Sequence, residues 1–173
     1  MCGIYIIKSA CNYKTPDTQV TGSMVNCAQS KNVIYTTPNT PGNTYTWTVT
    51  GGDIVSGAGT NQIEVNWGST AASSVSVNEN TTHNCPAFYE MGVIINPIPA
   101  TVISGNAIGC EGDINSYTTP ISVGNTYQWN ITGGTINSGQ GTNEINVTWN
   151  TTGANNLSLT ETIPATLCAT NIE

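Results

Sequence analysis

Apolar and polar residues alternate along several short segments of the chain, and this two-residue period predicts β-strands. In residues 44–50 the alternation places Tyr45, Trp47 and Val49 on one face. In residues 63–67 it does the same for Ile63, Val65 and Trp67. Further strands are expected at residues 19–21, 32–36 and 53–55, around Val75 and Val77, and at residues 88–95. No segment has a helical period of useful length, so the pattern predicts an all-β fold.

The same pattern occurs twice. Residues 43–67 return as residues 125–149 at a constant offset of 82, and 16 of the 25 positions are identical. The fixed positions are mainly aromatic, β-branched, Gly or Asn, as expected for a repeated structural unit. The four alternating core candidates of the first copy all recur in the second; the eight residues are Tyr45, Trp47, Ile63, Val65, Tyr127, Trp129, Ile145 and Val147.

The offset also defines the expected domains. Residues 16–98 and 99–173 form two seven-stranded β-sandwiches, arranged end to end through proline-containing junctions. Residues 1–15 correspond to the last strand of a preceding repeat, and the second repeat is expected to lack its own last strand. The chain is therefore interpreted as a window from a longer tandem array.

Composition narrows the possible partners. Charged residues make up only 8% of the chain, there is no arginine, and the net charge is −7. Binding to nucleic acid or to an anionic membrane surface needs Lys and Arg, so neither partner is expected. No segment is long and apolar enough for a membrane-spanning helix. The first residues lack the form of a signal peptide, so any secretion signal is expected outside this sequence.

The cysteines repeat as well. Cys27 corresponds to Cys110, and Cys85 corresponds to Cys168, both at an offset of 83. Repeat symmetry favours one disulfide in each repeat, Cys27–Cys85 and Cys110–Cys168; buried free thiols are the alternative. Cys2 would pair with a cysteine upstream, and Cys11 has no counterpart. Disulfides would place the protein outside the cytoplasm.

Candidate catalytic groups are few. The start Met1-Cys2-Gly3-Ile4 is similar to that of glutamine amidotransferases with an N-terminal cysteine nucleophile, but no arginine is available to bind a substrate carboxylate. His83 has no counterpart in the second repeat, and no cysteine, histidine or acidic residues have metal-ligand spacing. No catalytic residue, cofactor or metal is therefore expected, although a weak interdomain cation site near Asp17 or Glu111 stays open.

Two tryptophans leave a binding role open. Trp67 and Trp149 end their strands, so either could contact a glycan by stacking on a sugar ring, although packing in the core is the simpler interpretation. Asn80, Asn130, Asn146, Asn150 and Asn156 begin glycosylation sequons, which chance explains in a chain so rich in Asn and Thr.

The ordered motifs resemble a known family. The series Cys, Tyr-x-Trp, Gly-Gly-x-Ile, Ser-Gly-x-Gly-Thr-Asn-x-Ile-x-Val-x-Trp, Cys and Pro-x-Pro resembles the PKD-like repeats of large surface and secreted proteins in Bacteroidota. The better-known Trp-x-Phe-Gly-Asp-Gly motif is absent, which places the chain in a divergent branch. The resemblance implies an Ig-like sandwich, export that often uses type IX secretion, and a spacer or adhesive role, as in gliding-motility adhesins.

Three functions follow from these patterns. The first is a non-catalytic, extracellular repeat region of a cell-surface adhesin or stalk, whose partners are neighbouring repeats and possible surface polysaccharides or surface proteins. The second is a carbohydrate-binding module that uses Trp67 and Trp149. The third is a surface fibre assembled by strand complementation, in which residues 1–15 supply a strand that residues 99–173 lack.

Overall fold

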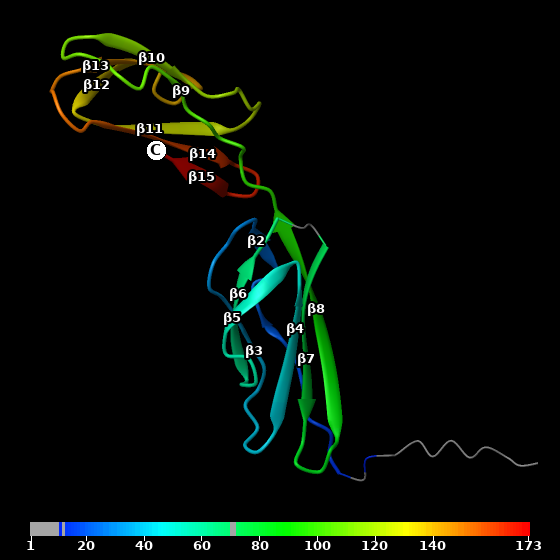
Figure 1. The fold of residues 1–173 in the computed structure, drawn as a ribbon. Helices are drawn as coiled ribbons and strands as arrows, with labels where there is room; N and C mark the ends of the chain where they lie inside the picture. Colours follow the sequence, from blue (N-terminus) through cyan, green and yellow to red (C-terminus); the bar gives the residue numbers. More distant parts are fainter. Residues whose placement is uncertain (1–10, 12, 70–71) are drawn as a thin grey trace, which may run out of the picture. The chain divides into compact units, whose positions relative to one another are not determined.

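The computed structural model describes residues 11, 13–69 and 72–173 of the 173-residue chain. The described residues form β-strands joined by turns and contain no α-helix. The chain divides into two compact units, Met1–Ile95 and Asn96–Glu173 (Figure 1). Each unit is a sandwich of two mainly antiparallel sheets, so the predicted all-β fold with tandem Ig-like sandwiches is confirmed.

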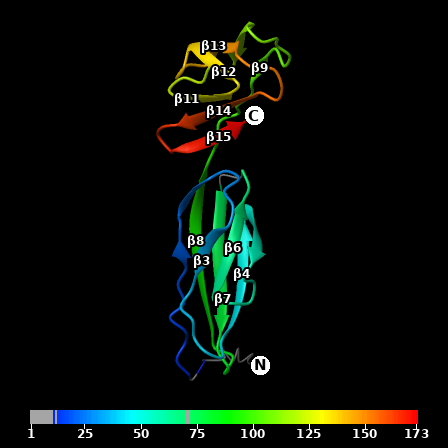
Figure 2. The same ribbon diagram turned by 90° about the vertical axis from the view of Figure 1, so that its left-hand side faces the viewer.

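The first repeat stacks two four-stranded sheets. Figure 1 shows them nearly edge-on, and in Figure 2 the sheet containing β3 and β6 lies in front of β7 and β8. One sheet has the order β1-β3-β6-β5 and the other β2-β8-β7-β4. The bounds are β1 (Thr21–Gly22), β2 (Val25–Cys27), β3 (Val33–Thr36), β4 (Thr44–Thr50), β5 (Gly52–Ser56), β6 (Gln62–Trp67), β7 (Ala72–Asn80) and β8 (Pro86–Asn96).

The second repeat has the same plan with a smaller second sheet. Its first sheet has the order β12-β13-β10-β9, and its second has the order β11-β14-β15. The bounds are β9 (Ser104–Gly105), β10 (Ile114–Thr118), β11 (Thr126–Thr132), β12 (Gly134–Ser138), β13 (Glu144–Trp149), β14 (Asn156–Ile163) and β15 (Cys168–Ile172). Even a register shift recurs, between Ile54 and Ser56 and between Ile136 and Ser138.

The alternating apolar residues face the space between the sheets. In β4, the residues at alternate positions from Tyr45 are buried or half-buried, while the threonines between them are exposed. The eight core candidates named from the sequence are all buried. The indole Nε1–H of Trp47 donates to the Thr60 carbonyl at 2.8 Å, and that of Trp129 donates to the Thr142 carbonyl at 2.9 Å. Each tryptophan thus joins its strand to the opposite sheet's glycine-rich turn while its ring fills the core.

Two features differ from the sequence interpretation. Strand β2 was not predicted, because Val25-Asn26-Cys27 is too short to show an alternating pattern. The expectation that the second repeat lacks its last strand also needs correction. Strand β15 pairs with β14, with Leu159 opposite Ile172, as β8 pairs with β7. It is the first part of the equivalent strand and has five residues where β8 has eleven.

The turn between β5 and β6 provides a matched test of backbone geometry. Gly57 and Gly59 both have positive φ, at 80° and 89°, but only at Gly57 would an added Cβ collide with a backbone atom, the Gln62 carbonyl oxygen. Gly57→Ala is therefore expected to lower the free energy of unfolding of the first repeat by about 2 kcal/mol, and Gly59→Ala by about 1 kcal/mol. Hydrogen exchange of amides in β6 would measure both. Equal costs would show that φ alone, and not the close contact, requires glycine at Gly57.

Candidate functional site

A tyrosine–tryptophan pair lies at the same place in each repeat. The Trp67 Nε1–H donates to the Tyr35 hydroxyl oxygen at 3.2 Å, with the rings edge to face and their centroids 5.9 Å apart. In the second repeat Trp149 donates to Tyr117 at 3.0 Å, with centroids 6.1 Å apart. β13 places Trp149 and β10 places Tyr117, and these two strands are neighbours in one sheet. The pair therefore satisfies a buried N–H within the core.

The Tyr35 hydroxyl shows how enclosed this position is. Burial raises the pKa of Tyr35, although hydrogen bonds from Trp67 and from the Asn26 side chain act in the opposite direction. The hydroxyl also donates to the Ser23 carbonyl oxygen at 2.8 Å. It stays protonated at neutral pH. Its role is structural, because its hydrogen bonds all link segments of the same repeat.

The possible glycan contacts need correction. Only 1% of the Trp67 side chain and 7% of the Trp149 side chain are exposed. A sugar ring stacks on an accessible aromatic face, and neither residue presents one on the outer surface. The alternation that suggested strand ends continues into the core, so both tryptophans pack inward. Each tryptophan borders a surface hollow: Trp67 lines one of about 450 Å³ with Gly52 and Asn66, and Trp149 lines another with Tyr117.

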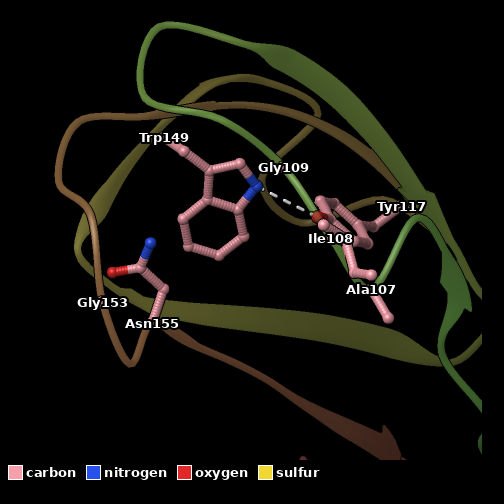
Figure 3. A pocket seen from close by; sticks show the side chains of 7 residues that line it. All are labelled: Ala107, Ile108, Gly109, Tyr117, Trp149, Gly153 and Asn155. Carbon is pink, nitrogen blue, oxygen red and sulfur yellow. Dashed lines mark hydrogen bonds between the residues drawn. The ribbon is translucent and has the colours of Figure 1, made fainter.

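The hollow beside Trp149 is a concavity of about 240 Å³ in the second repeat (Figure 3). In Figure 3, Trp149 and Tyr117 form one side of it, and Asn155 faces them from a separate stretch of chain. Its other lining residues are Ala107, Ile108, Gly109 and Gly153. Near Gly109 lies the side-chain nitrogen of Asn115, which is buried and has no hydrogen-bond partner. The hollow thus has two aromatic side chains along one side and, close to Gly109, a side-chain N–H group without an acceptor.

The first repeat explains why the second has this hollow. There, β8 continues past Met91 to Asn96, and Ile94 N–H donates to the Met24 carbonyl at 2.8 Å, which holds β2 in the sheet. In the second repeat β15 ends at Ile172, and residues 107–110 form no strand. Leu157 is only half-buried, whereas its counterpart Val75 is fully buried. The hollow thus lies where the first repeat has the end of β8.

Each repeat also contains a buried carboxylate, which the sequence interpretation missed. Glu79 and Glu161 are each 1% exposed. Glu161 accepts hydrogen bonds from Asn125 Nδ2 at 2.7 Å and from Thr101 Oγ1 at 2.9 Å. Glu79 accepts equivalent bonds from Asn43 and Thr18, each at 2.7 Å. A charged residue at the same repeat position, in a chain with so few charges, is the signal that could have identified them.

The carboxylates hold the segment that leads into each sandwich. Thr101 and Thr18 lie just after the junction prolines Pro99 and Pro16, whereas Glu161 lies on the central strand β14 of its sheet. A buried carboxylate needs hydrogen-bond donors to offset its lost hydration, and here the leading segment supplies one of the two. We call each Thr–Glu–Asn arrangement the junction clamp.

The expected disulfides need correction. Cys85 bonds to Cys11, with their Cα atoms 5.6 Å apart, and not to Cys27. Cys27 and Cys168 are each disulfide-bonded, whereas Cys110 is a free, exposed thiol. Neither predicted pair forms, because repeat symmetry gives equivalent positions but not proximity. Cys2 lies outside the described residues.

The residues considered for chemistry are not brought together. His83 stacks on Tyr13, with ring centroids 3.9 Å apart and planes within 8°, so it supports the leading segment beside the Cys11–Cys85 bond. Asp17 and Glu111 are exposed. Across residues 11, 13–69 and 72–173, no group of three or more His, Cys, Asp or Glu residues is arranged to hold a metal. Nor does this part of the chain contain a helix that could cross a membrane.

The sequence profile of the PKD-like domain matches the chain twice, at residues 13–87 and 96–170. The chain belongs to the PKD-like domain family. The two matches begin 83 residues apart and each includes a tyrosine–tryptophan pair and a junction clamp. PKD-like domains in tandem, with disulfides, are typical of extracellular structural or adhesive regions, and this all-β fold is typically non-catalytic.

Solved structures with similar folds are distant from these PKD-like repeats. Murine CEACAM1b is 12% identical, with 88% of this chain and 96% of that chain covered and a TM-score of 0.34. The Bacteroides ovatus mixed-linkage glucan utilization protein SGBP-B, solved with a heptasaccharide, is 15% identical, with coverages of 92% and 46% and a TM-score of 0.35. Protocadherin gamma B7 extracellular cadherin domains 1–4 are 8% identical, with coverages of 90% and 49% and a TM-score of 0.32.

This chain therefore spans about half the length of the last two structures. No curated protein sequence matches it significantly. At this level of similarity none of the three structures is an argument for function here.

Proposed function

We propose that the chain is a non-catalytic, extracellular structural region of a large bacterial cell-surface adhesin or stalk, in which tandem PKD-like repeats act as spacers and adhesive units. The resemblance to repeats of Bacteroidota surface proteins supports this proposal, as does the membership of a family that occurs in tandem. Type IX export and a link to gliding motility belong to the same proposal. Neighbouring repeats are the primary partners, and surface polysaccharides or proteins are the secondary ones.

The observation that carries the proposal is the junction clamp. In a spacer, the linker must enter each folded repeat in a fixed direction, which requires the leading segment to be attached to the sheet. In each repeat a threonine that follows the junction proline bonds to a buried carboxylate on an inner strand of the second sheet. These hydrogen bonds have nearly equal lengths in the two repeats. The attachment of the leading segment is therefore repeated in the chain, as the core residues are.

Small-angle X-ray scattering of the full chain tests this role. Proline junctions and clamped leading segments are expected to keep the repeats apart in solution, which would give a maximum dimension close to the summed lengths of two sandwiches. A particle no longer than a single globule of 173 residues would contradict the proposal. Pro97→Gly together with Pro99→Gly is the control, and should broaden the distribution of dimensions without changing the unfolding of either repeat.

One observation favours a second function, the surface fibre assembled by strand complementation. Residues 156–158 of β14 pair with β11 on one side, but β15 does not extend to them on the other. The hollow lies near this open edge, where the first repeat has the end of β8. Residues 8–13 of another copy are the aligned donor. They would place Lys8 and Asn12 where Met91 and Ile95 point inward, which is a poor match for an apolar groove. A concentration series in light scattering separates the two functions, because a fibre subunit grows in mass whereas a spacer stays monomeric.

A further inference from the structure

The two repeat cysteines of one sandwich lie at opposite ends of the same sheet. Cys85 immediately precedes β8, whereas Cys27 ends β2, which pairs with the far part of β8 around Ile94. Figure 1 shows β2 at one end of the first repeat and the hairpin between β7 and β8 at the other. Ile94 lies nine residues after Cys85, and its partner Met24 lies three residues before Cys27, so at least about six residues of extended strand, roughly 20 Å, separate the two cysteines. A disulfide needs Cα atoms within about 7 Å. They cannot bond to each other.

The hairpin cysteine of the first repeat bonds to the chain that precedes the sandwich. Its partner Cys11 lies before residue 13, where the family match begins. The hairpin end is thus the end at which the chain arrives. The β2 end is the end from which the chain leaves, because β8 finishes there at Asn96. A cysteine at the β2 position therefore lies at the end of its own sandwich from which the chain continues into the next repeat.

Cys110 occupies the position in the second repeat that corresponds to Cys27 at the end of β2, although no strand forms there. It is the only free thiol among the described cysteines. Its counterpart Cys27 is disulfide-bonded. The local turn is the same in both repeats: the Cys27 carbonyl accepts from Ser30 N–H at 3.2 Å, and the Cys110 carbonyl accepts from Asp113 N–H at 3.0 Å. Asp113 Oδ2 also accepts from Cys110 N–H at 2.8 Å. Cys110 is held in a defined turn with its thiol exposed.

We propose that Cys110 is the site of a disulfide to another repeat, and that its partner is a hairpin cysteine equivalent to Cys85 and Cys168. This inference rests on the proposed tandem-array function and adds a covalent link to it. The bond forms by two exchange steps with a low-molecular-weight disulfide as the oxidant. The Cys110 thiolate attacks that disulfide and releases one small thiolate. The partner thiolate then attacks the mixed disulfide at Cys110 and releases the second, so two thiols are oxidised and one disulfide is reduced.

Adding one repeat tests the link. Glu173 corresponds to Glu90, so a chain in which residues 91–173 are repeated after Glu173 continues the pattern in register. After oxidation in a buffer of reduced and oxidised glutathione, native alkylation and non-reducing peptide mapping are expected to find Cys110 of the 173-residue chain labelled, either by the alkylating agent or by glutathione. In the longer chain Cys110 is expected to be at least tenfold less labelled and linked to the added copy of Cys168.

Two variants of the longer chain make the result decisive. With the added copy of Cys110 replaced by serine, no labelled thiol should remain at either β2 position. With Cys110→Ser at the original position, the added copy of Cys168 should become the labelled thiol. A Cys110 that is labelled equally in both chains, or is linked only to a second molecule's Cys110, would overturn the inference. Scattering that shows separated repeats would still support the spacer role in that case, so the two proposals can fail independently.

Discussion

Trp67→Ala is expected to lower the free energy of unfolding of the first repeat by about 4 kcal/mol, within the range for truncating a buried tryptophan. The ring is 1% exposed and contacts Tyr35 edge to face, so its removal leaves a cavity in a close-packed core. It also removes the donor that satisfies one bond of a buried hydroxyl. Hydrogen exchange of β6 and β3 amides at increasing denaturant would measure the change in this repeat separately from the other.

The matched variant is Trp149→Ala in the second repeat, for which we expect a smaller loss of about 2–3 kcal/mol. Trp149 is 7% exposed against 1% for Trp67 and borders a hollow of about 240 Å³, so its ring has fewer neighbours to lose. The same variant tests the remaining carbohydrate hypothesis at the hollow that Trp149 shares with Tyr117. Retention of the chain on an immobilised polysaccharide that is lost in Trp149→Ala, but kept in Trp67→Ala when both remain folded, would support a sugar site there. Equal stability losses would show that the hollow does not lessen the packing of Trp149.

The sequence alone predicted the parts of the fold that depend on local periodicity. Alternation identified β4, β6 and their counterparts, because inward and outward positions of a strand differ in side-chain type. It did not identify β2, whose three residues contribute too little pattern and whose strand conformation depends on pairing with β8. Strands that exist through long-range pairing are not visible in a local pattern.

The site residues were less predictable for a related reason. Repeat arithmetic correctly made Cys27 equivalent to Cys110, but equivalence in sequence does not state which residues are neighbours. The Cys11–Cys85 bond joins positions 74 residues apart, through a segment that the repeat pattern left without a counterpart. Likewise, the position of Trp67 at the end of β6 fits either a buried or an exposed side chain. Whether it is buried depends on how the opposing sheet packs against it, which the local sequence does not show.

Glu161→Ala is expected to lower the free energy of unfolding of the second repeat by about 3 kcal/mol. The carboxylate is buried and accepts two bonds at 2.7 and 2.9 Å, so its removal leaves the Asn125 and Thr101 donors without a partner and opens a cavity. Thr101→Val is expected to cost less, about 1–1.5 kcal/mol, because the Asn125 bond to the carboxylate survives. Hydrogen exchange of β14 amides would measure both variants, and Glu79→Ala should reproduce the larger loss in the first repeat.

Glu144→Ala is the control, because this carboxylate accepts a bond from Ser116 at 3.0 Å on an exposed part of the same repeat. Its removal should change the free energy of unfolding by no more than about 0.5 kcal/mol, since water replaces the lost partner. If Glu161→Ala were equally harmless, the buried carboxylate would not anchor the leading segment. The linker would then meet the sandwich without a fixed attachment, and scattering from Glu161→Ala should be indistinguishable from that of the unaltered chain. Under the clamp mechanism, the same variant should instead show a broader distribution of dimensions while both repeats remain folded.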